Sequence, residues 1–363
     1  MIICSDCFLD TEIKSRIETH AKEGVCSVCG KQAACTYDTK RDEYLNGIFD
    51  KILNVYTPVS SLEYPVDASK HTFIKNEFID NWNIFKKDVS SEVVYRIVRE
   101  ISKDLYAEFP QLFDSPVVSL IFEDKESLEK NSMLKAYTWE EFVDALKHKN
   151  RFHTNYVNWE ILKVFCSYIR KTYKKGQKFF RGRISSIDGF RCDEMGAPER
   201  GKSSNGRANA KGIRRLYLAS DIDTTIHEVR TGAFDYVSIG EFELKEDITV
   251  VDFKMINKIS PFIEELNIIQ YLINKEYFNK IDLEMGKALR RNDSELDYVP
   301  TQYIADFIQS LIHEGKYEYA GIEYKSTLNP NGYNVAIFNP DLFECVKTEV
   351  YQIDQLRYEK RKI

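Results

Sequence analysis

Two pairs of closely spaced cysteines constrain the start of the chain more than any other sequence feature. Cys4 and Cys7 form one C-x₂-C pair, Cys26 and Cys29 form a second, and 18 residues separate the two pairs. Each pair supplies two thiolates from one tight turn, and four thiolates match the tetrahedral coordination of Zn²⁺. A closed four-cysteine site leaves no open position for a substrate. We therefore predict a structural zinc ion in a module formed by residues 1–35.

A module of that length cannot fold on apolar burial alone, so the metal would supply much of its stability. The polar segment Asp10–Lys22, between the two pairs, is expected to form a short helix. His20 and Cys35 rank below the four cysteines as ligand candidates. The alternative interpretation is a chance cluster of free thiols in a chain that holds eight cysteines.

The spacing of apolar residues divides the rest of the chain into two parts. Residues 36–175 have mainly helical spacing, and we expect helices over Ser90–Glu108, Thr138–Lys147 and Trp159–Tyr173. From residue 176 to residue 363, short β-type runs alternate with helical segments, which predicts an α+β domain. The expected strands cover 178–183, 215–219, 237–244, 248–253, 320–324 and 333–338, and the expected helices cover 223–230, 260–289 and 301–314.

Charge and hydropathy exclude several classes of protein. The net charge is −6, which argues against nucleic acid as a general partner. No apolar run approaches the roughly 18 residues of a membrane span. The first residues, Met1-Ile2-Ile3-Cys4, lack the charged start and apolar stretch of a signal peptide, so we expect a cytoplasmic protein. The sequence also lacks the common phosphate-binding loops, the G-x-S-x-G elbow of hydrolases and the H-E-x-x-H zinc motif.

The C-terminal part carries polar residues in a series of short motifs. These are Phe-Phe-Arg-Gly-Arg around Arg181, Gly-Arg-Ala-Asn around Arg207, Leu-Tyr-Leu-Ala-Ser around Tyr217, Tyr-Lys-Ser ending at Ser326 and Gly-Tyr-Asn ending at Asn334. Glu228 follows Tyr217 on the expected helix 223–230. Arg207 belongs to the polar, basic segment Gly201–Gly212, which we expect to be a mobile loop.

The order of these motifs resembles the RES domain, which is named for an arginine, a glutamate and a serine. The resemblance spans about residues 176–345 and places the three at Arg181, Glu228 and Ser326. RES toxins are bacterial toxin–antitoxin proteins whose fold is similar to ADP-ribosyltransferases and which consume NAD⁺. The N-terminal half resembles the zinc-bearing N-terminal domains of HEPN/RES effectors. The implied architecture is α+β: a small zinc ribbon and a helical N-terminal domain, followed by an ADP-ribosyltransferase-like RES domain.

The resemblance also implies an activity. A RES enzyme would bind NAD⁺ as its substrate and break the nicotinamide–ribose bond, depleting NAD⁺ by hydrolysis or phosphorolysis. It would act as a toxin or antiphage defence effector, held inactive by a cognate antitoxin or regulatory partner. A homo-oligomer is compatible with this interpretation, which leaves the acceptor of ADP-ribose, the trigger and the antitoxin open.

Residue chemistry fits this implied reaction. Cleavage of the bond passes through a ribosyl cation, which a carboxylate such as Glu228 can stabilise. Arg181 is the first choice for the phosphates and Arg207 the second, because a planar guanidinium binds phosphate oxygens in pairs. Tyr217 offers a flat ring against nicotinamide, and Ser326 offers a hydroxyl that can orient a ribose or an amide. The expected catalytic set is Arg181, Tyr217, Glu228 and Ser326, and the expected NAD-binding set is Arg181, Arg207, Tyr217, Ser326 and Asn334.

Each assignment has a plainer alternative. Glu228 can be an ordinary surface carboxylate, Arg181 one half of a structural ion pair and Tyr217 a core residue. The loop arginines can form a solvated basic face. For the whole chain, two other functions stay open. One is an ADP-ribosyltransferase that modifies a protein or nucleic acid, and the other is a zinc-ribbon adaptor without enzymatic activity.

Overall fold

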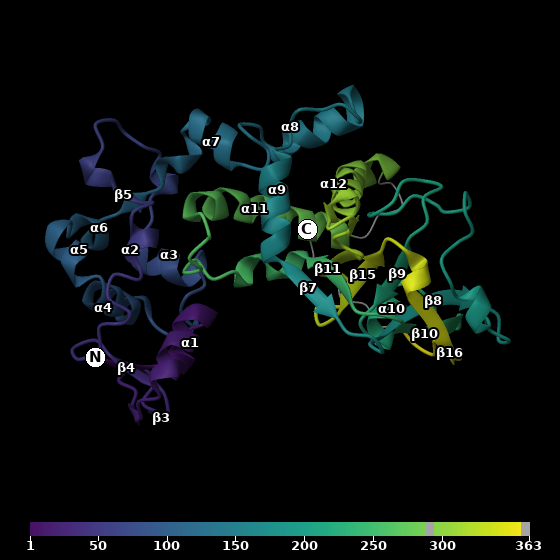
Figure 1. The fold of residues 1–363 in the computed structure, drawn as a ribbon, viewed down its shortest axis with the longest axis horizontal. Coiled ribbons are helices and arrows are strands. Elements are labelled where there is room, and N and C mark those ends of the chain that lie inside the picture. The colour runs from purple at the N-terminus through teal and green to yellow at the C-terminus, as the bar shows by residue number, and fades with distance from the viewer. Residues whose placement is uncertain (288–293, 357–363) are drawn as a thin grey trace. The chain divides into compact units, whose positions relative to one another are not determined.

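The computed structural model describes residues 1–287 and 294–356 (Figure 1). The chain divides into two compact units, of which unit 1 comprises Met1–Ala136 and Asn257–Lys275, and unit 2 comprises Tyr137–Ile256 and Glu276–Ile363. The predicted segments 1–35, 36–175 and 176–363 divide the chain at other positions, and they stay a prediction about its domains. None of the described helices combines the length and the apolar character needed to cross a membrane.

Unit 1 consists of short helices and two-stranded ribbons. Its helices are α1 (Thr11–His20), α2 (Asp50–Leu53), α3 (Ile74–Asp80), α4 (Ser91–Ile101), α5 (Lys103–Glu108), α6 (Gln111–Asp114) and α7 (Lys125–Asn131). Its ribbons pair β1 (Ile2–Cys4) with β4 (Thr36–Asp38), β2 (Gly24–Val25) with β3 (Gln32–Ala33), and β5 (Thr57–Pro58) with β6 (Val117–Val118). The α1 helix confirms the helix expected between the cysteine pairs, and the side chain of Asp10 caps it by accepting from the Ile13 N–H.

The predicted helix Ser90–Glu108 is two helices, because Ser102 leaves the helical conformation (φ −102°, ψ 44°). The carbonyl of Ile101 accepts a hydrogen bond from the N–H of Gly47 instead of continuing one helix. The helical spacing of apolar residues in this segment predicts one buried face, formed by Val94, Ile97, Val98, Ile101 and Leu105. The first four are buried on α4, whereas Leu105 on α5 is half-buried. Periodicity identified the buried face correctly, whereas the break depends on a contact between residues far apart in the chain.

Unit 2 contains, within the described residues, an eight-stranded mixed sheet with the order β16-β10-β8-β9-β15-β14-β11-β7. The strands are β7 (Arg170–Tyr173), β8 (Lys178–Ser185), β9 (Leu216–Ala219), β10 (Tyr236–Leu244), β11 (Ile248–Asp252), β14 (Gly321–Lys325), β15 (Tyr333–Ile337) and β16 (Phe343–Gln352). Among the described strands of this sheet, only β11 and β14 pair in parallel. The helices are α8 (Trp139–Asp144), α9 (Trp159–Tyr168), α10 (Ile222–Glu228) and α12 (Val299–Ser310), and α11 (Ile268–Gly286) runs from unit 1 residues into unit 2 residues. The predicted α+β class is confirmed.

Three helix predictions in unit 2 have the wrong ends. The helix predicted to run to Tyr173 stops at Tyr168, and residues 170–173 pair with β11 as an edge strand.

The helix expected from Ser260 begins at Ile268, and the Ser260 hydroxyl instead accepts from the Phe262 N–H in a turn. The last residues expected for this helix, 288 and 289, lie outside the described residues. The helix predicted to end at Glu314 ends at Ser310. A small hairpin follows, β12 (Ile312–His313) with β13 (Lys316–Tyr317), in which Glu314 and Gly315 adopt positive φ angles.

The sheet separates between β8 and β9. These two strands are paired only at Phe180 and Ala219, whereas β8 pairs with β10 along its whole length. Next to the separation, α10 lies against β8 at Gly182. A Cβ atom at Gly182 would approach the Thr225 side chain to 2.7 Å and that of Val229 to 3.2 Å. Glycine is therefore required here for α10 to reach its position on the sheet.

We expect Gly182→Ala to destabilise the protein by about 1–3 kcal/mol, because the added methyl must push α10 away from β8. Gly196→Ala is the matched control, since a Cβ there meets no atom within 4 Å and its φ is not positive. The control should change stability by less than about 0.5 kcal/mol. Denaturant unfolding measures both changes, and equal midpoints for the two variants would contradict the proposed close packing.

Candidate functional site

A cavity of about 300 Å³ opens in unit 2 where β8 and β9 separate. Its wall is formed by residues 180–182 of β8, residues 217–219 of β9, Thr225 and Glu228 of α10, Val229 directly after that helix, Tyr324 of β14, and Asn334 of β15. Four residues predicted from sequence, Arg181, Tyr217, Glu228 and Asn334, thus line one cavity although they are up to 153 positions apart in the chain. The separation of the two strands provides the space, and α10 and the neighbouring strands provide the side chains.

The carboxylate of Glu228 is held by two hydrogen bonds to the same oxygen. Its Oε1 accepts from the Ser326 hydroxyl at 2.7 Å and from the Asn334 Nδ2 at 2.8 Å. The other oxygen, Oε2, has no hydrogen-bond partner among residues 1–287 and 294–356. The carboxylate is therefore fixed in orientation while one of its oxygens stays available to a ligand.

Ser326 donates a hydrogen bond to Glu228 and is not itself one of the residues lining the cavity. Its Oγ accepts from the backbone N–H groups of Leu328 (3.3 Å) and Asn329 (3.1 Å) while it donates to Glu228. The Asn329 side chain in turn donates to the Thr224 hydroxyl at 2.8 Å, which ties this turn to the first residues of α10. The turn after β14 and the helix that carries Glu228 therefore stabilise each other.

Arg181 brings a buried positive charge to the cavity. Its Nη1 donates to the Tyr217 carbonyl at 3.2 Å, and its Nε is buried without a hydrogen-bond partner in the described part of the chain. No carboxylate among those residues lies within ion-pair distance of it, so the structural ion pair considered from sequence is absent there. Burial, followed by the charge of Arg183, lowers the pKa of Arg181 to about 10, and the guanidinium thus stays charged at neutral pH. A cation in this environment favours an anionic ligand.

The hydroxyl of Tyr217 is bonded within the protein. The hydroxyl donates to the Asn209 Oδ1 at 2.7 Å and accepts from the Ala208 N–H at 3.0 Å. A Cβ at Gly206 would lie 2.5 Å from that hydroxyl oxygen, so the loop can close over it only with glycine there. Burial raises the pKa of Tyr217 far above neutral pH. Tyr217 lines the cavity, and its hydroxyl holds the loop 201–212 in place.

Arg207 lies outside the cavity lining. Its Nε and Nη2 donate to the Lys287 carbonyl at 3.1 and 2.9 Å, its Nη1 donates to the Asp297 carbonyl at 3.0 Å, and its guanidinium covers the Tyr298 ring at 4.5 Å. These contacts occupy the guanidinium in holding backbone together. The segment 201–212 is a loop as predicted, but Arg207 and Asn209 at its centre are buried.

Tyr324 is one of the cavity residues that the sequence did not single out. It stands two positions before Ser326 on β14, and it lies directly opposite Asn334 in the β14–β15 pairing. An aromatic residue in a buried strand is ordinarily a core residue, which is why the sequence alone did not mark it. The sequence offered one signal: Tyr324 stands two positions before Ser326, and side chains two positions apart on a strand lie on the same face of the sheet.

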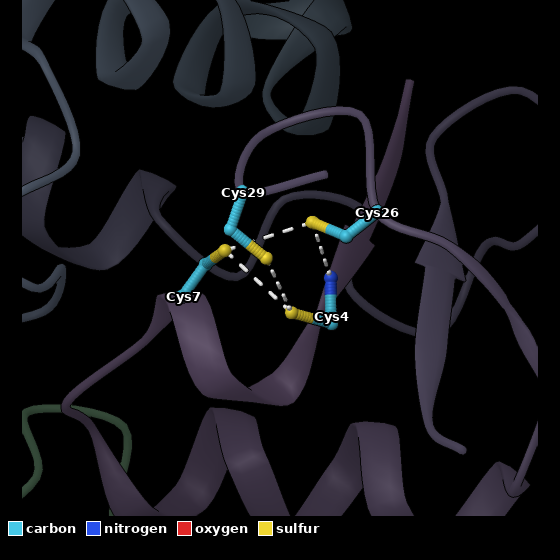
Figure 2. A group of neighbouring side chains, drawn as sticks. All are labelled: Cys4, Cys7, Cys26 and Cys29. Atoms are coloured by element: carbon cyan, nitrogen blue, oxygen red, sulfur yellow. Dashed lines mark hydrogen bonds between the residues drawn. The ribbon is translucent and has the colours of Figure 1, made fainter. Parts of the chain in front are cut away.

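The four predicted cysteines form one cluster in unit 1 (Figure 2). Their Sγ atoms all lie within 4.8 Å of one another, and three of the sulfur–sulfur distances are 3.6 Å. A tetrahedral ion with metal–sulfur bonds of about 2.3 Å would hold its ligands about 3.8 Å apart. The arrangement of Cys4, Cys7, Cys26 and Cys29 therefore fits a bound metal ion. His20, which stacks on Tyr44, and Cys35 do not belong to this cluster.

Backbone amides support the cluster. The N–H groups of Cys4 and Val28 donate to the Sγ of Cys26 at 3.3 and 3.4 Å, one of them drawn in Figure 2. Burial opposes ionisation of Cys26, but these and other backbone hydrogen bonds outweigh it and lower the pKa of that thiol to about 7. Burial raises the pKa of Cys4 to about 11. Gly30 (φ 72°) donates its N–H to the Cys26 carbonyl at 3.0 Å and so closes the tight turn between Cys26 and Cys29.

Comparison with known families separates the chain into two matched segments. Residues 183–359 match the RES domain, and residues 19–158 match the HEPN/RES N-terminal domain 1. The first match contains Tyr217, Glu228, Ser326 and Asn334, whereas Arg181 lies two positions before its start. The second contains Cys26 and Cys29 but not the first cysteine pair. Neither the curated proteins nor the solved structures gave a match.

We expect the purified protein to contain about one metal ion per chain, because the four thiolates fit a single tetrahedral ion. Cys26→Ser removes one ligand and should lower that stoichiometry well below one, together with the protease resistance of residues 1–35. Cys35→Ser is the control, since Cys35 is outside the cluster. Elemental analysis after purification without chelator measures the stoichiometry, and a wild-type value far below one would rule out a structural metal site.

Proposed function

The chain is a RES-domain protein with a HEPN/RES N-terminal domain, and on that premise we propose that its cavity binds NAD⁺ and breaks the bond between nicotinamide and ribose. One observation supports the proposal most strongly: the same cavity holds the Glu228 carboxylate, one oxygen of which has no partner in the described residues, and the Arg181 guanidinium, which has no counter-ion among them. NAD⁺ has a positive charge at the nicotinamide ring and negative charges on its two phosphates. The cavity supplies the opposite charge for each.

Glu228 stabilises the reacting ribose in this proposal. When the bond between the ribose C1′ and the nicotinamide nitrogen breaks, its electron pair leaves with nicotinamide and positive charge develops on the ribose. The free Oε2 of Glu228 stabilises that charge, while Ser326 and Asn334 keep the carboxylate in one orientation. A water molecule then forms the new bond to C1′ and releases a proton, which yields ADP-ribose. Phosphate can take the place of water in the same step.

Arg181 binds the pyrophosphate. Its partnerless Nε and its charge at neutral pH support this role. The cavity volume of about 300 Å³ is at the low end of the range for small-molecule sites, so it accommodates the nicotinamide riboside half of the dinucleotide. The Tyr217 ring is available to pack against nicotinamide, since its hydroxyl is bonded to the loop. Arg207 contributes to this NAD-binding set indirectly, by bonding that loop to the backbone of Lys287 and Asp297.

The family supports a biological setting as well. We infer a cytoplasmic toxin or defence effector that depletes NAD⁺ and is controlled by an antitoxin or another regulatory partner. The cysteine cluster supports a structural zinc ion, because four thiolates are the ligand set that Zn²⁺ favours. With four protein ligands such an ion has no open position and takes no part in the reaction.

Glu228→Gln should keep the fold but lower the rate of nicotinamide release by about 10²–10⁴, because the neutral amide cannot stabilise the ribosyl cation. Asp223→Asn is the matched control, since Asp223 is an exposed acid on the same helix, outside the cavity. The assay follows nicotinamide and ADP-ribose by chromatography, and transfer of label to macromolecules reveals an ADP-ribosyltransferase instead. A Glu228→Gln variant as active as the control would remove Glu228 from the mechanism.

Arg181→Lys should weaken NAD⁺ binding about tenfold or more, because an ammonium group cannot make the paired contacts of a guanidinium with phosphate. Arg183→Lys, two positions along the same strand and outside the cavity lining, serves as the control. Steady-state kinetics measures the change in KM. Equal KM values for the two lysine variants would mean that Arg181 makes no bidentate contact with the substrate.

A further inference from the structure

The Tyr324 hydroxyl is a hydrogen-bond donor that the described part of the protein leaves unused. The side chain lines the cavity on the central strand β14 and is 6% exposed. Its hydroxyl makes no hydrogen bond to any residue in 1–287 or 294–356. The residue as a whole is buried, but its hydroxyl oxygen is not one of the fully buried atoms that lack a partner, so it is accessible at the cavity wall. An accessible donor that no described residue uses is available to a ligand in the cavity.

Two neighbouring tyrosines show how unusual this hydroxyl is. The Tyr217 hydroxyl in the same cavity is bonded on both sides, to Asn209 and to Ala208. The Tyr173 hydroxyl in the same sheet donates to the buried carboxylate of Glu323. Both hydroxyls therefore have hydrogen-bond partners within the protein. The Tyr324 hydroxyl has no such contact with the described residues.

The position of Tyr324 relates it to the reacting carboxylate. It faces Asn334 directly across the β14–β15 pair, and the side chains of such a pair lie on the same face of the sheet. The Asn334 amide in turn donates to Glu228. Burial, and after it the charges of Tyr217 and Glu228, raises the pKa of Tyr324 well above its ordinary value, so the phenol keeps its proton. A protonated phenol beside a carboxylate donates to a neutral oxygen, since an anionic phosphate there would be repelled by Glu228.

We propose that Tyr324 donates a hydrogen bond to an uncharged oxygen of the nicotinamide riboside half of the substrate, next to the bond that breaks. This inference rests on the proposed NAD⁺ cleavage. It divides the cavity between two donors: Arg181 contacts the phosphates, and Tyr324 contacts the ribose or carboxamide oxygen. Tyr324 would then determine how well the enzyme accepts dinucleotides altered at that half.

Tyr324→Phe tests the assignment, because it removes the hydroxyl and keeps the ring. In the full-length protein we expect kcat/KM for NAD⁺ to fall about five- to tenfold, the effect of one lost neutral hydrogen bond. The thermal midpoint should stay unchanged or rise, since a hydroxyl without a partner in the protein contributes nothing to folding. Tyr319→Phe is the control: it deletes another buried phenol outside the cavity and should leave kcat/KM within about twofold of wild type.

Two outcomes overturn the inference. A Tyr324→Phe enzyme with wild-type kcat/KM would show that substrate does not accept from this hydroxyl. A thermal midpoint that falls together with activity would show that the hydroxyl is bonded within the protein and acts structurally. If the wild-type protein releases no nicotinamide from NAD⁺, the proposed function itself is wrong and the substrate assignment of Tyr324 falls with it. In that case the thermal midpoints of wild type and Tyr324→Phe still show whether the hydroxyl is bonded within the protein. The failure of the proposed function can therefore be told apart from the failure of the Tyr324 assignment.

Discussion

The candidate site depends on the contact between α10 and β8 at Gly182. Because this residue has no side chain, Thr225 and Val229 can reach the strand, and the last turn of α10 then brings Glu228 to the cavity. The separation of β8 from β9 beside this contact provides the space for a ligand. Where backbone pairing stops, the Arg181 side chain bonds to the Tyr217 carbonyl. One arginine thus bridges the two strands and supplies the positive charge of the cavity.

The residues named from sequence separate into those that face the cavity and those that hold them in place. Glu228 and Arg181 face it with unused hydrogen-bonding atoms, whereas Ser326 is fully occupied in orienting Glu228. Arg207 holds backbone that follows α11 and precedes α12. The short motifs mark both kinds of residue alike, because polar residue type and spacing are the same for a side chain that positions another and for one that faces a ligand. Their separation requires the hydrogen-bond partners, which only the structure provides.

Short sequence patterns predicted those features that depend only on residues close together in the chain. The cysteine cluster was found from spacing, since two tight turns suffice to bring four thiolates together. Strands whose residues are mostly buried, such as β10 and β15, were also found. The edge strands β7 and β16 were missed because their residues are largely exposed, so they carry no clear apolar alternation. Tyr324 was missed for the opposite reason: an aromatic residue in a buried strand looks like a core residue. That its hydroxyl has no partner among the described residues becomes clear only from the structure.

The central claim is that the cavity between β8, β9 and α10 holds NAD⁺ with its scissile bond beside residue 228. A crystal structure of the Glu228→Gln protein with NAD⁺ tests this most directly, because slow turnover preserves the intact dinucleotide. The account predicts the nicotinamide ribose next to residue 228, the pyrophosphate against the Arg181 guanidinium and the nicotinamide ring near Tyr217. Dinucleotide bound away from these residues, for example in the hollow lined by Trp139 and Lys147, would contradict it.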